Sequence, residues 1–392
     1  MRLVDYIANY IVDNGITDGF SVVGGGAVHL NDAFGHKDGL NMLYNHHEQA
    51  SSMAAESYAR LHSKPALVCV TTGPGGINAL NGVACAYLDS LPMLVISGQV
   101  RYDTTEVYEK EITGASLRSE GDQEYHIVES VKAMTKYAVM IKDKDTIRYH
   151  LERALYLATT GRKGPTWIDI PVDIQNSDID PTTQKSYFDS DEYNDDKKYI
   201  CDVVSDDDIK YVLSEVKKAK RPVLYAGYGI RLAGAYDSFK KMIEKLDIPV
   251  VTYWNAIDLI ETDHRLYCGR GGNMGDRPGN FAVQNSDLLI IIGSRVSIRQ
   301  TGYLYSEWAK KAKVIMIDID KEEMKKHTLH IDKKINADAK VFIDKMNDAL
   351  DKDKRNVSDD QWIKKCHEWK EKYKVVTDKN YIKQTCVTIV SV

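Results

Sequence analysis

The sequence predicts an α/β fold with two doubly wound domains, each built on a parallel sheet. Two observations lead to this prediction. Short apolar segments, typical of buried strands, alternate with segments of helical periodicity, and strands separated by helices indicate βαβ units. An acidic, polar stretch at residues 177–208 interrupts the alternation and has the composition of a linker. We therefore expect one domain at residues 1–176, a second at residues 209–350 and a tail at residues 351–392.

The elements of the first domain follow from apolar spacing and glycine positions. Leu3, Ile7, Tyr10 and Ile11 recur at helical spacing, and Gly15 ends that helix. Later segments rich in Val, Ile and Leu have the composition of buried strands. We expect strands at residues 20–23, 66–70, 93–96 and 165–170, and helices at residues 77–88 and 146–159.

The second domain repeats the pattern after the acidic stretch. Its strands are expected at residues 223–226, 249–252, 288–292 and 314–317, and a helix is expected in the tail at residues 361–373. The final twelve residues, YIKQTCVTIVSV, fit no element.

Composition excludes several classes of protein. A net charge of −5 argues against a nucleic-acid binder. No apolar run approaches the roughly 20 residues that span a bilayer, and the N-terminus lacks the pattern of a secretory signal. The six cysteines are scattered without a CxxC pair, which is typical of a reducing cytoplasm. We expect Cys69 and Cys85 to lie in the core.

Two glycine-rich turns and one carboxylate form the main candidate site. Gly24-Gly25-Gly26 and Gly73-Pro74-Gly75-Gly76 both follow predicted strands, and ligands bind at the carboxyl edge of an open parallel sheet. Glu48 stands where another strand gives way to a helix rich in small residues. The alternative interpretation is a pair of plain tight turns with a first-turn acid that favours the helix dipole.

Other chemistry-bearing residues give weaker signals. His46 and His47 are adjacent, and neighbours on a strand point to opposite faces, so we do not expect them to share a metal ion. Gly227 and Gly229 follow a strand, but the next glycine is Gly234, which breaks the GxGxxG spacing. Asp318 ends a strand, where it is equally typical of a ribose-binding acid or of a polar strand terminus.

Several segments together resemble one known family. They are HHEQASSMAAESYAR, TTGPGGINALNGVACAYLDSLPMLVISGQV, TKYAV, GRKGPTWIDIPVDIQ, RPVLYAGYGI, IPVVTYWNAIDLI, NFAVQNSDLLIIIGSRV and VIMIDIDKEE. In order and spacing they resemble the acetolactate-synthase-like family of thiamine-diphosphate enzymes, to about residue 350. The resemblance implies a pyrimidine-binding domain followed by the family's central domain.

The resemblance also assigns roles in the first domain. Glu48 matches the glutamate that hydrogen-bonds the pyrimidine nitrogen of the cofactor and promotes loss of the thiazolium proton. The loops around that ring match Gly25, Gly26, Gly73, Pro74, Gly75 and Asn78. Gln123 matches a glutamine near the reacting centre. The implied activity is decarboxylation of a 2-oxo acid, such as pyruvate, and transfer of a two-carbon unit to a carbonyl acceptor.

The second domain corresponds to one that binds FAD in true acetolactate synthases. The matching segments contain Gly227, Gly229, Arg295, Arg299 and Asp318. The loop GRGGNMGDRPGN differs from those synthases, so FAD remains a candidate structural ligand that we do not require. A flavin- or nucleotide-binding module that uses only this domain is one alternative function.

Departures from the family concern the acceptor. Gly24 replaces the proline of the usual Pro-Gly-Gly loop, Asp122 stands where the synthases have an aromatic residue before Gln123, and residues 104–121 are inserted or remodelled. We therefore expect an acceptor other than a second small 2-oxo acid, and a ketosugar of a surface-polysaccharide pathway is the candidate. The synthases themselves serve branched-chain amino acid biosynthesis.

The largest departure is the diphosphate-binding motif. The family holds Mg²⁺ with a GDG motif and an asparagine pair in a third domain, and neither Gly121-Asp122-Gln123 nor Gly275-Asp276-Arg277 fits that context. We expect no metal site in this chain, with Mg²⁺ supplied by a missing domain or a companion chain. A truncated, inactive relic or partner subunit is the second alternative.

Association follows from the same family pattern. The helix after Glu48 is rich in small residues, among them Ser51, Ser52, Ala54 and Ala55, and Gly82 lies in the next predicted helix. Such surfaces allow close approach of a second chain, so we expect a homo-oligomer, a dimer or a tetramer.

Overall fold

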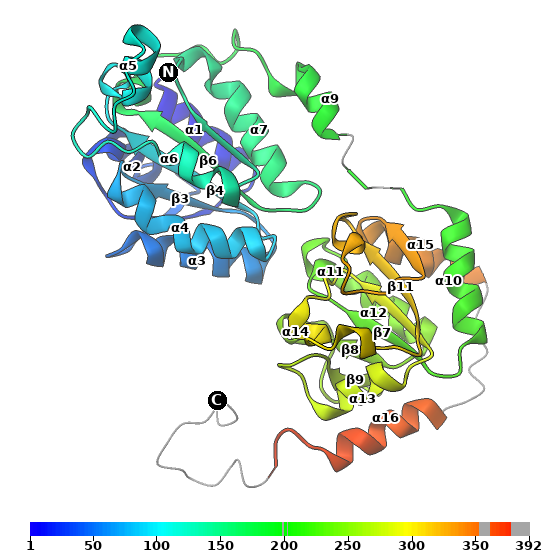
Figure 1. Ribbon diagram of the computed structural model, residues 1–392. Coiled ribbons are helices and arrows are strands. Elements are labelled where there is room, and N and C mark those ends of the chain that lie inside the picture. The colour runs from blue at the N-terminus through cyan, green and yellow to red at the C-terminus, as the bar shows by residue number, and fades with distance from the viewer. Residues whose placement is uncertain (198–199, 202, 353–360, 378–392) are drawn as a thin grey trace, which may run out of the picture. The chain divides into compact units, whose positions relative to one another are not determined.

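The computed structural model describes residues 1–392 except 198–199, 202, 353–360 and 378–392 (Figure 1). The chain divides into two compact units, Met1–Ile200 and Cys201–Val392. Each unit has one six-stranded sheet in which all strand pairs are parallel. The predicted fold class is confirmed.

The first sheet has the strand order β2-β1-β3-β4-β6-β5. Its strands are β1 (Asp18–Ser21), β2 (Asn41–Tyr44), β3 (Ala66–Val70), β4 (Met93–Gln99), β5 (Tyr137–Met140) and β6 (Pro165–Pro171). The helices of this unit are α1 (Leu3–Asp13), α2 (Val28–Gly35), α3 (Glu48–His62), α4 (Pro74–Leu88), α5 (Glu106–Thr113), α6 (Ile127–Val131), α7 (Ile147–Thr159), α8 (Val172–Gln175) and α9 (Asp191–Lys197).

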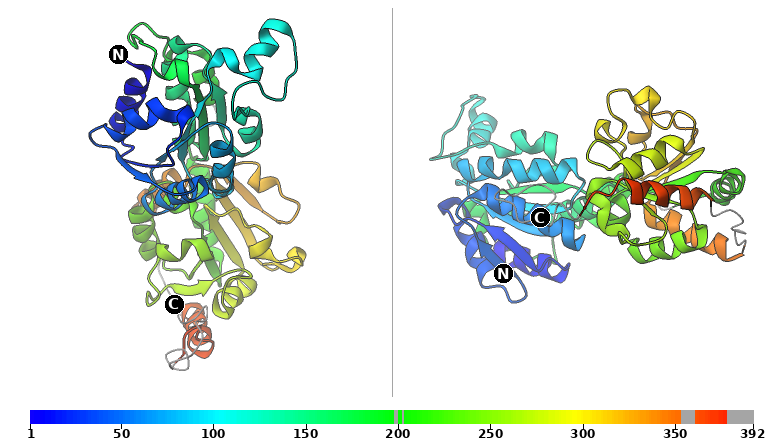
Figure 2. Two further views of the ribbon diagram at one scale, coloured as in Figure 1. Left: turned by 90° about the vertical axis from the view of Figure 1, so that its left-hand side faces the viewer. Right: turned by 90° about the horizontal axis from the view of Figure 1, so that it is seen from below.

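Helices cover both faces of this sheet (Figure 2). One face packs on α1, α2 and α7 through apolar side chains such as Ile7, Phe34 and Leu151. The other carries α3 and α4, which lie side by side (Figure 1). Because both faces are covered, the central strands β3, β4 and β6 are buried along their whole length.

The second sheet has the order β12-β11-β10-β7-β8-β9. Its strands are β7 (Pro222–Ala226), β8 (Val250–Thr252), β9 (Tyr267–Arg270), β10 (Leu288–Ile292), β11 (Lys313–Asp318) and β12 (Lys333–Asn336). Its helices are α10 (Asp206–Lys218), α11 (Gly229–Leu232), α12 (Tyr236–Leu246), α13 (Arg277–Asn285), α14 (Ile298–Thr301), α15 (Ala339–Lys352) and α16 (Gln361–Lys372).

Part of the stretch predicted as a linker is built into the first unit. Tyr187 is fully buried in a cluster of aromatic rings with Tyr149, Tyr156 and Tyr193. Its backbone N–H donates to Glu152 Oε2 over 2.8 Å. The acidic composition concealed this contact because the anchoring residues are tyrosines dispersed among aspartates. At the other end, α10 already begins at Asp206.

The predicted tail also contains packed structure. The indole N–H of Trp362 in α16 donates to the carbonyl of Pro222 over 3.1 Å, and Cys366 is buried in the core of the second unit. The helix predicted at residues 361–373 is confirmed as α16, while the final twelve residues lie outside the described part of the chain. None of the helices that the structure describes combines the length and the apolar character needed to cross a bilayer.

Candidate functional site

The glycine turns after β1 and β3 touch each other at the carboxyl edge of the first sheet. The backbone N–H of Gly26 donates to Thr71 Oγ1 over 3.1 Å, and a Cβ atom on Gly24 would lie 2.5 Å from Thr71 Cβ. The strand order reverses between β1 and β3, and such a reversal is where open α/β sheets bind ligands. At Gly25, in contrast, an added Cβ would meet no atom of the described chain within 4 Å.

Gly73 joins this edge to the loop that carries Gln123. Gly73 has a φ of 58°, and a Cβ atom there would lie 2.0 Å from the carbonyl oxygen of Gln123. Both facts require glycine at this position. Pro74 follows as the first residue of α4, where its missing N–H costs nothing. The side chain of Gln123 is exposed. The structure thus brings these three predicted site residues together.

Glu48 is the first residue of α3 and is 9% exposed. Its Oε2 accepts a hydrogen bond of 3.0 Å from the amide of Asn78 in α4. Its Oε1 has no hydrogen-bond partner among the described residues and lies 3.5 Å from the position of a Cβ added to Gly75. Glu48, Asn78 and Gly75 therefore meet in one place, with one carboxylate oxygen left for a ligand.

A buried polar network lies below these turns. Asp169 on β6 is fully buried, and its Oδ1 accepts a 2.6 Å hydrogen bond from Ser97. Trp167 Nε1 donates to the same Ser97 hydroxyl over 2.7 Å. Burial raises the pKa of Asp169 to about 7. Sequence reasoning missed this residue, although a single acid inside the strand PTWIDIP was the available signal.

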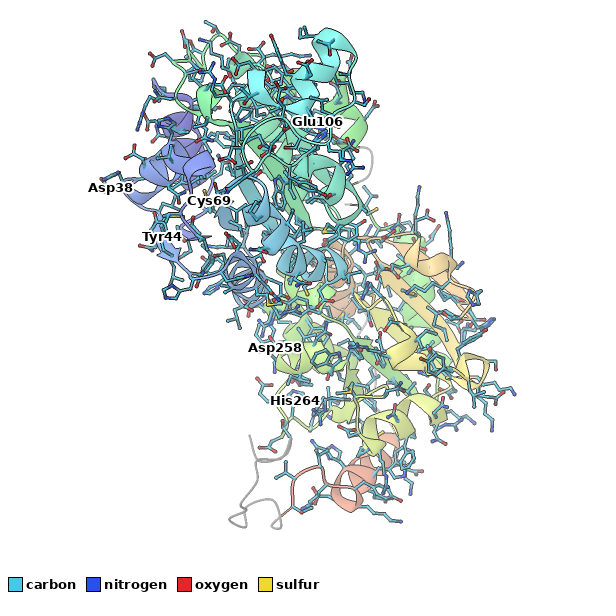
Figure 3. The ribbon with its side chains drawn as sticks, turned by 60° about the vertical axis from the view of Figure 1, so that its left-hand side comes forward. Asp38, Tyr44, Cys69, Glu106, Asp258 and His264 are labelled. Atoms are coloured by element: carbon cyan, nitrogen blue, oxygen red, sulfur yellow. The ribbon has the colours of Figure 1, made fainter. Side chains whose placement is uncertain are left out.

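The remaining polar candidates of the first unit have structural roles. His47 does not lie on a strand. It caps α3, where its Nδ1 accepts from the N–H of Gln49 over 3.1 Å. Cys69 is buried on β3 (Figure 3), and burial raises the pKa of its thiol to about 12. Cys85 is exposed, so its predicted core position is wrong. The described residues contain no group of three or more His, Cys, Asp or Glu that could hold a metal ion.

The five candidates of the second unit lie near the carboxyl edge of its sheet, whose order reverses between β7 and β10. A Cβ atom on Gly227 would lie 2.2 Å from the carbonyl oxygen of Gly293, and one on Gly229 would lie 2.8 Å from Gly293 Cα. These glycines therefore allow the turn after β7 to pack closely against the turn after β10. Asp318 Oδ1 accepts from the N–H of Asp320 over 2.9 Å. Arg295 is partly exposed and Arg299 is exposed.

Both units thus have the architecture of ligand-binding α/β domains, and comparison with known proteins places them in a family. A family model described as thiamine pyrophosphate enzyme, N-terminal TPP binding domain, matches residues 1–124. A second, thiamine pyrophosphate enzyme, central domain, matches residues 209–346. The chain belongs to the thiamine pyrophosphate enzyme family, and the resemblance seen in the sequence is confirmed.

Acetolactate synthases are among the similar proteins. The large subunit from Lactococcus lactis is 32% identical over 357 residues, which cover 90% of this chain and 57% of the relative. A probable acetolactate synthase large subunit from Methanococcus aeolicus is 34% identical, covering 88% of this chain and 56% of the relative. Isozyme 3 from Escherichia coli is 28% identical, with 93% and 61% covered. The chain therefore spans less than two thirds of the length of these relatives.

Two features of the Glu48 region suit a flat, nitrogen-containing ring such as the pyrimidine of thiamine pyrophosphate, the cofactor in the family's name. A flat ring must come close to the protein backbone. Gly25 allows this because it has no side chain and because no atom of the described chain lies within 4 Å of the position that a Cβ would take. A ring nitrogen needs a hydrogen-bonding partner, and Glu48 Oε1 has none in the described chain. Neither fact depends on the comparisons.

Proposed function

We propose that this chain binds the pyrimidine end of thiamine diphosphate at Glu48 and belongs to an enzyme that decarboxylates a 2-oxo acid. Pyruvate is the proposed donor, and a carbonyl compound is the acceptor of the two-carbon unit. The observation that carries the proposal is the meeting of Glu48, Asn78 and the two glycine turns at the reversal point of the first sheet. Similarity to acetolactate synthases supports it.

The chain's own residues would hold and orient the ring. Asn78 binds Glu48 Oε2 and so directs Oε1 toward the ligand. A carboxyl group at that position can share a proton with a ring nitrogen, because the site excludes most water around Glu48. When bound, thiamine diphosphate supplies the carbanion chemistry of the reaction. Mg²⁺ and the diphosphate would be held by a further domain or a companion chain.

A polar loop supports a ketosugar as the acceptor. Residues 114–126 contain exposed polar side chains, including Arg118, Asp122 and Gln123. The buried carboxylate of Glu124 orders this loop by accepting hydrogen bonds from the backbone N–H groups of Glu106, Glu120 and Gly121. A polar wall suits a polyhydroxylated acceptor better than a second small 2-oxo acid. Such an acceptor would place the enzyme in polysaccharide rather than branched-chain amino acid biosynthesis.

Association would use the outer sides of α3 and α4. The small residues that were predicted to form the interface instead pack α3 against α4 within the unit. Ser51, Ser52 and Ala55 are buried, and a Cβ atom on Gly82 would lie 2.4 Å from Ser52 C, so they allow these two helices to pack within the unit. Exposed apolar side chains remain, among them Met53, Ile77, Tyr87 and Leu88. We propose that they pair with a second copy of the chain.

FAD in the second unit is the less supported candidate. Gly227 and Gly229 are explained by packing against Gly293, and Asp318 binds its own turn. Arg295 and Arg299 remain as candidate contacts for an anionic ligand. The absorption spectrum of the purified protein tests this point, since near-stoichiometric flavin would establish the second ligand site.

The five described cysteines are free thiols, in keeping with a cytoplasmic enzyme.

Calorimetric titration with thiamine diphosphate and Mg²⁺ tests the proposed function directly. Binding by the wild-type chain that falls at least tenfold in Glu48→Gln, with no change in circular dichroism, would support it. His47→Asn is the matched control, because asparagine also caps helices. Release of CO₂ from pyruvate is followed in the same samples. A chain that shows no binding even with a diphosphate-binding domain of this family present would favour the inactive relic.

A further inference from the structure

The side-chain amide of Gln99, at the end of β4, is buried and fully hydrogen-bonded. Its Nε2 donates to the carbonyl of Tyr125 over 2.9 Å and to Asp169 Oδ2 over 3.1 Å. Its Oε1 accepts from the N–H of Val100 over 3.0 Å and from the hydroxyl of Thr72. An amide has two donors and two acceptor positions, so Gln99 has none left for a ligand.

The surroundings permit only one orientation of this amide. If it flipped, Oε1 would face the Tyr125 carbonyl, which can only accept a hydrogen bond. At the same time the NH₂ group would face the N–H donor of Val100. Each buried polar group left without a partner is costly. Asp169 is held in turn by Ser97, which accepts from Trp167. The side chains on β4 and β6 therefore lock Gln99.

Gln99 connects the two segments that form the proposed ring site. Thr72 directly precedes Gly73, a position at which the backbone conformation and the close contact allow only glycine. Tyr125 lies two residues after Gln123. Above the sheet edge the same segments touch where Gly73 meets the Gln123 carbonyl. Gln99 therefore holds the same two segments together at a second point, in addition to the contact between Gly73 and the Gln123 carbonyl.

We propose that Gln99 is a positioning residue, which sets the Gly73 turn and the Gln123 loop at a fixed separation while touching no ligand itself. Asp169 maintains its orientation. The expected effect of Gln99 on ligand binding rests on the proposed function, whereas its expected effect on the Gln123 loop does not. Loss of Gln99 should therefore free the loop first and weaken binding as a consequence.

Hydrogen exchange measured by mass spectrometry, on peptides covering residues 71–78 and 119–126, tests this proposal. Gln99→Met keeps the length of the side chain but removes all four hydrogen bonds. Thr72→Val removes only the hydroxyl, Thr72→Ser retains it, and Thr159→Val is a control because that hydroxyl bonds within α7. One lost hydrogen bond corresponds to roughly 2- to 12-fold faster exchange.

We expect faster exchange in both peptides for Gln99→Met and Thr72→Val, with Thr72→Ser and Thr159→Val close to wild type. Thiamine diphosphate affinity should fall in the same two variants. If Gln99→Met does not fold, Thr72→Val decides the question. Unchanged exchange of residues 119–126 in Thr72→Val would overturn the proposal, even if wild-type binding is strong. Faster exchange in a protein that binds no thiamine diphosphate would support the positioning role and refute the proposed function.

Discussion

Gly73 and Gly114 both have positive φ angles, but only Gly73 also presses against another segment. Alanine at Gly114 should cost about 1–2 kcal/mol of unfolding free energy, from backbone strain alone. Alanine at Gly73 adds a steric clash with the Gln123 carbonyl, worth a further ~1–3 kcal/mol. Urea unfolding of both variants measures the difference. Equal losses would show that the Gln123 loop does not lie against Gly73.

Asp169 makes stability depend on pH. Burial raises its pKa to about 7, above the ordinary value of about 4 in an unfolded chain. Between these values the folded protein holds a proton that the unfolded chain has lost. This group's stabilising contribution is therefore complete below about pH 4 and is lost as the pH rises through 7. From pH 5 to pH 8, the melting temperature of wild type should fall relative to that of Asp169→Asn. A constant difference between the two would contradict this account.

Among the elements, the central strands were predictable and the edge strands were not. Apolar residues dominate β3, β4, β6, β7, β10 and β11, because these strands are almost entirely buried. The strands without a sequence prediction, β2, β5, β9 and β12, all lie at the ends of their sheets. Three are only partly buried, and β9 contains Gly269 and Arg270. Edge strands need fewer apolar residues, so they lack the apolar segment from which a strand is predicted.

The helix α16 provides a test at the level of elements. Trp362 is buried against the second unit and donates to Pro222. Trp362→Ala should therefore destabilise this unit by about 3–5 kcal/mol, as measured by urea unfolding. Lys365→Ala, on the same helix, removes an exposed side chain and should change stability by less than about 0.5 kcal/mol. Similar small effects of both would mean that α16 is not part of the folded unit.

Part of the candidate site could be located from the sequence, and its role as a cofactor site stays a prediction. Glycine turns at strand ends and Glu48 could be found from the sequence because they interrupt its periodicity, and the family motifs added Asn78 and Gln123. Thr72, Gln99 and Asp169 were not found, since their significance depends on side-chain contacts between segments far apart in the chain. The inward direction of Ser52 and Gly82 was likewise set by helix packing that small residues alone do not reveal.

At the scale of the whole molecule, association should depend on the exposed apolar side of α3. Met53 is 41% exposed, and Met53→Glu should turn a dimer into a monomer because it places charge inside the proposed interface. Ile112→Glu on α5, which is also exposed, is the control and should leave the dimer intact. Analytical ultracentrifugation at micromolar concentration distinguishes the two. A wild-type chain that is already monomeric would contradict the proposed assembly.

The central claim is that Glu48 serves the cofactor ring, and one kinetic measurement tests it most directly. Residues 1–392 alone should release CO₂ from pyruvate no faster than background, because the proposed assignment gives them only the pyrimidine side of the site. A diphosphate-binding domain of this family, fused or supplied separately, should restore turnover. In that reconstituted enzyme we expect Glu48→Gln to lower kcat by about 10²- to 10⁴-fold, with His47→Asn and Cys85→Ala near wild type. Near-full activity of Glu48→Gln would contradict the assignment.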